Sequence, residues 1–226
     1  MFDNDDEIEK LKDNKAFCLY PWLNINSDTD GKVKLCCNIM DAYYAEDFDG
    51  EPFELGKDSI VDDIWNSEYY KDVRKKLAAG ERINTCKSCY RLEDAGQASP
   101  RTDFTAKMLH QDWVKDIVKQ TKKDGNLPTR PGSLELRLGN TCNLMCHSCF
   151  GKSSKLLSRE REEILNEHYD DKKYYIPEKL LNYWEHNERP TFGQEFKWHE
   201  SPIFLEDLDQ CVWYNFRAYL TGGEPT

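Results

Sequence analysis

Apolar positions repeat with strand and helix periods in different parts of the chain, and these periods predict its elements. Two short strand-like pieces, 22–25 and 32–35, flank the turn-rich segment 26–31, which predicts a β-hairpin. Apolar side chains recur every three or four positions over 60–79 and again over 104–122, which predicts two amphipathic helices. The first half of the chain is therefore expected to be α+β.

The second half opens with the clearest boundary in the sequence, the segment 124–132, which is rich in Gly and Pro. A strand is predicted over 134–138, a helix over 153–166 and a last strand over 216–220. Residues 168–205 are aromatic and charged and have no clear period. A strand, a helix and a strand in this order predict an α/β region.

Composition and charge restrict the possible functions. The 226 residues are 38% hydrophobic and 32% charged, which suits one large globular domain or two small ones. The net charge of −11 argues against nucleic acid or an anionic membrane as the main partner, because phosphates require neutralisation by Lys and Arg. No apolar stretch is long enough for a membrane span, and the N-terminus lacks the pattern of a secretory signal. We expect a cytoplasmic protein.

Cysteines are numerous and clustered. Disulfides are rare in a reducing compartment, and an odd number of cysteines fits a disulfide framework poorly. The nine are Cys18, Cys36, Cys37, Cys86, Cys89, Cys142, Cys146, Cys149 and Cys211. Clusters of this kind are typical of metal ligation, whereas Cys211 stands among apolar residues and is expected to be a core residue.

Three of the cysteines form one short loop directly after the predicted strand 134–138. Cys142, Cys146 and Cys149 are four and three residues apart. Three thiolates at this spacing can hold three irons of a cubane cluster, which leaves the fourth iron open to chelate a ligand. The alternative is a Cys3His zinc site that uses His147, which lies inside the loop.

A CxxxCxxC loop after a first strand resembles the radical SAM superfamily. Members of that family usually carry an aromatic residue just before the third cysteine, whereas this chain has Ser148 there and Phe150 just after. The sequence after the last predicted strand, Gly222-Gly223-Glu224, is similar to the GGE motif of the family. The resemblance implies that these three residues contact the amino group of S-adenosylmethionine. A simple strand-ending turn is the alternative for them.

The N-terminal cysteines resemble the SPASM and twitch auxiliary domains of the same superfamily. Their opening is a cysteine, about a dozen residues, a glycine, four residues and a second cysteine, which Cys18, Gly31 and Cys36 match. The resemblance implies one auxiliary [4Fe-4S] cluster. Its implied ligands are Cys18, Cys36, Cys86 and Cys89. A full SPASM domain binds two clusters and needs more cysteines, so the shorter twitch form is expected.

Alternatives remain for these N-terminal ligands. Neighbouring side chains of a strand point to opposite faces, so only one of Cys36 and Cys37 should face a cluster. The glycine spacing favours Cys36, with Cys37 as the alternative. A structural zinc site, or a set of inert buried cysteines, would also account for the pattern.

The resemblance predicts an α/β fold in three parts. A small α+β twitch-like cluster domain over 1–100 is followed by a helical linker over 101–127 and by the first part of a partial (β/α)6 radical SAM barrel over 128–226. Six β/α units of about 30 residues need roughly 180 residues, and the last segment is about half of that. We therefore expect a C-terminally truncated chain that is inactive alone.

The chemistry implied by the resemblance is the reductive cleavage of S-adenosylmethionine at a [4Fe-4S] cluster. The resulting 5′-deoxyadenosyl radical abstracts hydrogen from a substrate, for which a peptide is the first candidate. A reductant such as flavodoxin or ferredoxin would be a partner of this oxidoreductase or peptide-modifying enzyme. The rival hypothesis is a non-catalytic zinc-binding interaction module.

Overall fold

The computed structural model describes residues 1–2, 4–39, 43–142, 144–146, 149–167, 176–212 and 217–221. Their fold is mixed α/β, as the sequence predicted, and centres on one sheet of four strands in the order β2-β1-β3-β4. The strands are β1 (Asn24–Ser27), β2 (Val33–Lys34), β3 (Ser133–Arg137) and β4 (Arg217–Thr221). Strand β1 is antiparallel to β2 and parallel to β3, and β3 is parallel to β4.

The predicted hairpin is confirmed, with its first strand displaced toward the C-terminus. Trp22 and Leu23 end the short helix α2 (Tyr20–Leu23), and β1 begins directly after them. The turn closes through the amide of Gly31, which donates to the carbonyl of Asp28 at 3.0 Å. Gly31 has a φ of +86°, a left-handed conformation that glycine adopts without strain. The turn between β1 and β2 is therefore tight and well defined.

Each of the two predicted amphipathic helices is divided in the structure. The first becomes a π-turn, η2 (Ile60–Ile64), and helix α3 (Glu68–Ala78). The second becomes α5 (Pro100–Met108) and α6 (Asp112–Lys119). Ser67 caps the start of α3 by accepting from the amide of Tyr70, and Ser99 caps the start of α5 in a capping box with Thr102. Helix α6 begins after Gln111 without a side-chain cap. A hydrophobic period alone does not locate such caps.

The remaining helices include two that cover part of the segment without a clear period. The α-helices are α1 (Asp5–Glu9), α4 (Lys87–Asp94), α7 (Lys155–Glu167), α8 (Glu178–Tyr183) and α9 (Pro202–Val212). The short turns are η1 (Lys10–Lys12), η3 (Asn84–Cys86), η4 (Gly151–Ser153), η5 (Trp184–Glu188), η6 (Arg189–Thr191) and η7 (Trp198–Glu200). None of the described helices is long and apolar enough to cross a membrane.

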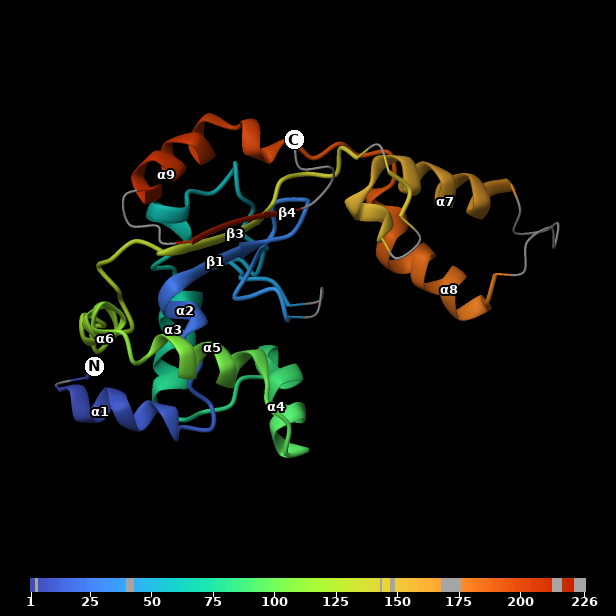
Figure 1. The fold of residues 1–226 in the computed structure, drawn as a ribbon. Coiled ribbons are helices and arrows are strands. Elements are labelled where there is room, and N and C mark those ends of the chain that lie inside the picture. The colour runs from blue at the N-terminus through green and yellow to red at the C-terminus, as the bar shows by residue number, and fades with distance from the viewer. Residues whose placement is uncertain are drawn as a thin grey trace.

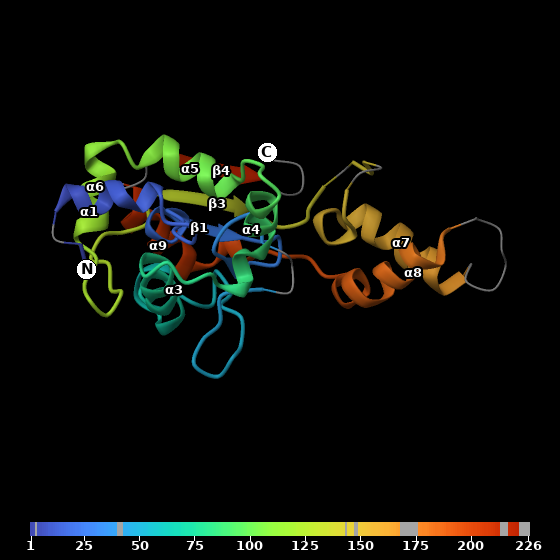
Figure 2. The same ribbon diagram turned by 90° about the horizontal axis from the view of Figure 1, so that it is seen from below.

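Helices lie on both sides of the sheet. Helix α9 lies on one side and α1, α2, α3, α5 and α6 on the other (Figure 1). Helices α7 and α8 form a lobe that projects away from this body in both views (Figures 1 and 2). Helix α9 is fixed to the N-terminal half by Asp207, whose carboxylate accepts from the hydroxyl of Ser59 at 2.7 Å and from the amide of Ile60 at 2.6 Å.

One sheet joins the two segments for which separate domains were predicted. Strand β1 belongs to the segment 1–100 and β3 to the segment 128–226, yet they pair in parallel from Asn24 and Ser133 onward. The four described strands form an open sheet. The three-part domain division and the partial (β/α)6 barrel stay predictions.

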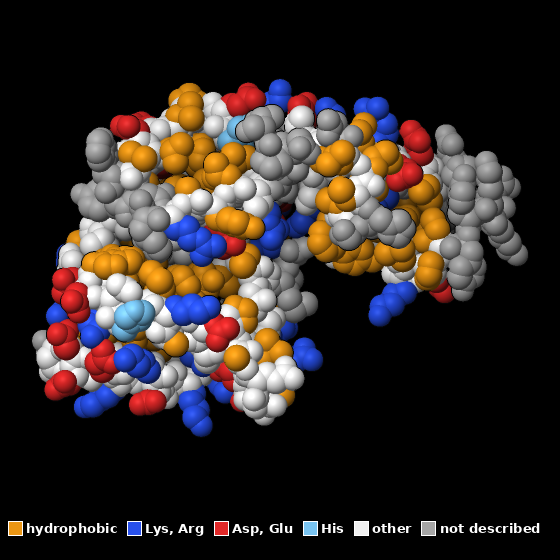
Figure 3. All heavy atoms as spheres, in the orientation of Figure 1, with side chains coloured by type: hydrophobic (Ala, Val, Ile, Leu, Met, Phe, Trp, Pro, Cys, Tyr) orange, Lys and Arg blue, Asp and Glu red, His pale blue; other side chains and the backbone are white. Residues whose placement is uncertain are grey.

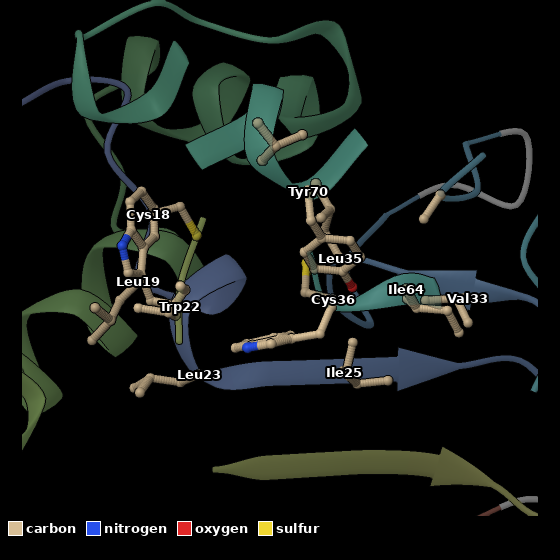
Figure 4. Packing of buried hydrophobic residues seen from close by; sticks show 14 of the residues in the cluster. Cys18, Leu19, Trp22, Leu23, Ile25, Val33, Leu35, Cys36, Ile64 and Tyr70 are labelled. Carbon is tan, nitrogen blue, oxygen red and sulfur yellow. The ribbon is translucent and has the colours of Figure 1, made fainter. Parts of the chain in front are cut away.

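The core lies mainly between β1 and the helices of the N-terminal half. Trp22, Ile25 and Tyr70 are fully buried there, and Cys18 and Cys36 belong to the same cluster (Figure 4). Arg74 of α3 is also fully buried, with its guanidinium 4.4 Å from the ring centroid of Trp65. The core therefore reaches the N-terminal cysteines and fixes their surroundings.

Candidate metal centres

Four N-terminal cysteines line one pocket, although they come from four separate places in the chain. Cys18 precedes α2, Cys36 follows β2, Cys86 ends η3 and Cys89 lies in the first turn of α4. The space between the lining side chains is about 320 Å³, including its mouth. The other lining residues are Tyr20, Asn38, Ile39, Thr85, Ser88, Pro100 and Arg101. None of the nine cysteines forms a disulfide.

Three of the four pocket thiols are buried, Cys86 is half-buried, and all four are close enough to influence one another. Cys18, Cys36 and Cys89 are 5%, 9% and 7% exposed. Burial raises the pKa of Cys18 well above its usual range, and the neighbouring thiols of Cys86, Cys36 and Cys89 raise it further. Burial, and next the thiol of Cys89, raise the pKa of Cys86 to about 12. The fold thus gathers four thiols around one pocket.

The structure separates the two adjacent cysteines. Cys36 lines the pocket, whereas Cys37 lies beside the carboxyl group of Glu135 on β3. Burial, and next the negative charge of Glu135, raise the pKa of Cys37 to about 11. Of the two alternatives that the sequence left open, Cys36 is therefore the one that meets Cys18, Cys86 and Cys89.

Arg101 joins the elements that carry these thiols. Its Nε donates to Oε1 of Glu93 on α4 at 2.8 Å, and its Nη1 donates to the carbonyl of Phe17, next to Cys18. The side chain is 6% exposed and lines the pocket itself. Sequence analysis missed Arg101, because it lies in the predicted linker and belongs to no recognisable spacing.

Asn38 is a second pocket residue that the sequence analysis missed. Its Nδ2 donates to Sγ of Cys89 at 3.3 Å. Hydrogen bonds to thiolate sulfur tune the potential of iron–sulfur clusters. Its position two residues after Cys36 is the only signal that sequence offered.

A single zinc ion and a cubane cluster hold their thiolates at different separations. Among the residues that the structure describes, no group of three or more His, Cys, Asp or Glu is placed to hold a single metal ion. Bonds of about 2.3 Å would bring the thiolates of a tetrahedral zinc site to about 3.8 Å from one another. A cubane binds each thiolate to a different iron and so holds them further apart. Four thiols around one pocket fit such a group.

The three-cysteine loop is more open than the N-terminal pocket. Cys146 is exposed, and its carbonyl accepts from the amide of Cys149 at 2.9 Å. Burial raises the pKa of Cys149, a hydrogen bond from the backbone of Phe150 partly offsets this, and the thiols of Cys142 and Cys146 raise the pKa further. The apolar side chains around them are exposed, namely Leu144 and Met145 at 49% and Phe150 at 54%. His147, the fourth ligand of the alternative zinc site, lies outside the described residues, as does Ser148.

The α7–α8 lobe holds the end of this loop. Nη2 of Arg161 on α7 donates to the carbonyl of Cys149 at 2.8 Å. The carboxylate of Glu188 accepts from the amide of Gly151 at 2.9 Å and also pairs with Arg161. The guanidinium of Arg161 lies 4.9 Å from the ring centroid of Trp184. These buried contacts fix the backbone directly after the third cysteine.

The predicted contact of S-adenosylmethionine, Gly222-Gly223-Glu224, lies outside the described residues. The described chain reaches Thr221, the last residue of β4, whose carbonyl accepts from the amide of Leu138 at 2.8 Å. The carboxyl ends of β3 and β4 therefore lie side by side, and the cysteine loop follows the first of them. Ligands of parallel α/β sheets bind at this edge.

A family comparison matches the N-terminal half. Residues 18–90 match the family model of SPASM, described as an iron-sulfur cluster-binding domain. The matched residues cover about a third of the chain and include all four thiols of the N-terminal pocket. This match supports the expected auxiliary-cluster domain. Neither the curated proteins nor the solved structures yielded a match to the chain.

Proposed function

We propose that the protein is a radical SAM enzyme with an auxiliary iron–sulfur domain. The observation that carries this proposal is a SPASM-matched pocket of four thiols on the same sheet as a CxxxCxxC loop. The four thiols hold an auxiliary [4Fe-4S] cluster, and the loop holds the cluster that binds S-adenosylmethionine. A one-electron reductant such as flavodoxin or ferredoxin serves it, and a peptide is the proposed substrate.

The auxiliary site is built for electron transfer rather than for substrate chelation. Cys18, Cys36, Cys86 and Cys89 occupy all four iron positions of one cubane, so no iron is left for an outside ligand. The hydrogen bond from Asn38 to the sulfur of Cys89 stabilises the reduced, more negative form of the cluster. Burial excludes water from three of the four sulfurs.

The loop site differs from the auxiliary site because it supplies three thiolates instead of four. Cys142, Cys146 and Cys149 fill three iron positions, and the amino group of the bound S-adenosylmethionine is assigned to Gly222, Gly223 and Glu224. When bound, the cluster and S-adenosylmethionine supply a carbon radical that abstracts hydrogen from the substrate. The chain's own part is to fix the backbone of Cys149 through Arg161 and to surround the thiolates with apolar side chains. Those side chains exclude water once the site is closed.

Anaerobic reconstitution with iron and sulfide tests the proposal. We expect a brown protein with about eight irons per chain, the content of two cubanes. Addition of S-adenosylmethionine to the reduced protein should change the electron paramagnetic resonance signal of one cluster and leave the other unchanged. A colourless protein that holds stoichiometric zinc would overturn the proposal in favour of a zinc-binding interaction module.

A further inference from the structure

The buried carboxylate of Asp28 pairs with side chains that neighbour both cysteine sites in the sequence. Asp28 directly follows β1 and is fully buried. Its Oδ2 lies 2.7 Å from Nζ of Lys34 and 2.8 Å from Nζ of Lys152. Its Oδ1 accepts from Nη1 of Arg137 at 2.5 Å. Tyr44 adds a hydroxyl at 3.4 Å. Four side chains from separate parts of the chain thus meet at one carboxylate.

Two of the cations stand at the two ends of the three-cysteine loop. Arg137 ends β3, five residues before Cys142. Lys152 lies in η4, three residues after Cys149. By pairing with both, Asp28 holds the entry and the exit of the loop at one point.

The third cation, Lys34, is close in sequence to a cysteine of the N-terminal pocket. Lys34 ends β2 and precedes Cys36, one of the pocket thiols, by two residues. Its side chain is 3% exposed, so water screens its pairing with Asp28 only weakly. The carboxylate therefore contacts the strand that delivers a pocket cysteine as well as both ends of the loop.

The turn that carries Asp28 is itself fixed. The amide of Asp28 donates to the carbonyl of Lys32 at 2.9 Å, which closes the hairpin. The next residue, Thr29, is fully buried and donates its hydroxyl to the carbonyl of Lys152 at 3.1 Å. A side-chain pair and a backbone contact thus tie the same turn to the exit of the loop.

Electrostatics keep this arrangement together. Burial would raise the pKa of Asp28, but the charges of Lys152 and Lys34 outweigh it and lower that pKa to about 2. The carboxylate is therefore ionised at neutral pH. Without its charge, three cations would face one another in a buried space and would repel.

We propose that Asp28 is a positioning residue that fixes the three-cysteine loop relative to the N-terminal cysteine pocket. The proposed function gives this positioning its purpose, since the two sites would then hold two clusters at a set separation. Asp28 itself touches no thiol, so its effect passes through Arg137, Lys152 and Lys34.

The test compares Asp28→Asn with Asp30→Asn in the metal-free, reduced full chain. Asp30 lies in the same turn and pairs with Nζ of Lys32 at 3.4 Å, and its carboxylate also accepts from the amide of Lys32 at 3.3 Å. Alkylation of each cysteine is followed by mass spectrometry. We expect Asp28→Asn to raise the alkylation rates of the loop thiols by about tenfold and Asp30→Asn to leave them unchanged. Cys18 and Cys36 should stay protected in both variants.

Two outcomes would overturn the proposal. Equal loop reactivity in the two variants would mean that Asp28 does not hold the loop. An equal rise at Cys18 and Cys36 would mean that Asp28 only stabilises the whole fold. If Asp28→Asn fails to fold, Lys152→Gln replaces it, because this variant removes one pairing and leaves Lys34 and Arg137 on the carboxylate. Loop thiols that then react no faster than in the parent chain would count against the proposal.

A second readout uses the reconstituted protein. The magnetic interaction between two reduced clusters reports their separation, and we expect its distribution to broaden in Asp28→Asn while the iron content stays at about eight. An unchanged distribution would contradict the proposal. If the parent chain binds no iron, the proposed function fails, but the alkylation experiment still decides the role of Asp28.

Discussion

The N-terminal cysteine pocket and the three-cysteine loop bring their thiols together in opposite ways. The pocket collects thiols from distant points of the chain, and three of the four are at most 9% exposed. The loop takes all three of its thiols from eight consecutive residues, and Cys146 is exposed. The first site depends on the fold, whereas the second depends on a short spacing and on what the surrounding elements do to its two ends.

This difference shows what each region requires from the rest of the molecule. The pocket needs α4 and α5 to stay together next to the segment that carries Cys18. Arg101 of α5 provides this, because it pairs with Glu93 of α4 and donates to the carbonyl of Phe17. The loop needs its ends held. Asp28 does so through Arg137 and Lys152, and Arg161 does so at the carbonyl of Cys149. Damage to the core should therefore destroy the pocket first, while the loop should respond to the loss of single polar contacts.

The largest expected effect is the loss of iron from one cysteine site at a time. Cys36→Ala should remove the N-terminal cluster, and Cys146→Ala the loop cluster, each lowering the iron content from about eight to about four. Cys37→Ala is the matched control, because Cys37 lies beside Glu135 and outside the pocket. It should keep both clusters, as measured by iron analysis and electron paramagnetic resonance. Loss of both clusters from Cys146→Ala would mean that the sites are not separate.

The second expected effect concerns the core beneath the pocket. Trp65 is fully buried and donates its indole N–H to the carbonyl of Thr129 at 2.6 Å. Trp65→Ala should lower the free energy of unfolding by about 3–5 kcal/mol, because it leaves a large cavity. Leu180→Ala in the lobe should cost less than about 1 kcal/mol, since Leu180 is 40% exposed. Urea unfolding measures both, and similar costs would contradict the proposed dependence of the pocket on the core.

The sequence predicted the fold best where the pattern was local. The hairpin, the strand before the loop and the last strand are confirmed because each rests on a short run of alternating or apolar residues. The burial of Cys211 is also confirmed, at 0% exposed. The cap Ser67 starts α3 within the first predicted helix, and a hydrophobic period does not register such a cap. The break between α5 and α6 has no side-chain cap at Gln111.

The sites could be predicted only in part, for the same reason. The cysteines were found by their spacing, and the SPASM match over residues 18–90 supports an iron–sulfur cluster-binding domain there. The individual ligand assignments stay predictions. Arg101, Asn38 and Asp28 could not be found from the sequence, because each acts on residues that are distant in the chain or belongs to no motif. Only the pairing of β1 with β3 brings Asp28 to both ends of the loop.

A smaller effect should appear in acid. The ordinary pKa of Asp28 is 3.8, and the folded protein lowers it to about 2. A carboxylate whose pKa is lowered by folding contributes stability above its unfolded value and loses it as the pH falls through the folded value. This group should therefore contribute about 2 kcal/mol at neutral pH, which disappears between about pH 4 and pH 2.

The measurement is the difference in the free energy of unfolding between the parent chain and Asp28→Asn. The difference should be large at pH 7 and should shrink by about 2 kcal/mol at pH 2. The same measurement on Asp30→Asn gives the general effect of acid on this turn, which is then subtracted. A difference that does not change with pH would mean that the cations around Asp28 do not stabilise its charge in the folded protein.

The smallest effect distinguishes a contact between the two regions from a contact within one of them. Thr29 donates its hydroxyl to the carbonyl of Lys152 at 3.1 Å, and Thr191 donates to the carbonyl of Glu188 at 2.7 Å inside the lobe. Thr→Val removes such a bond while it keeps the shape of the side chain, at a cost of about 1 kcal/mol. Thr29→Val should therefore speed alkylation of the loop thiols by about fivefold, since it loosens the exit of the loop. Thr191→Val should leave that rate unchanged, because the backbone after Cys149 would still be held by Asp28 and Arg161. A faster reaction in Thr191→Val than in Thr29→Val would place the control of the loop in the lobe instead of in the hairpin turn.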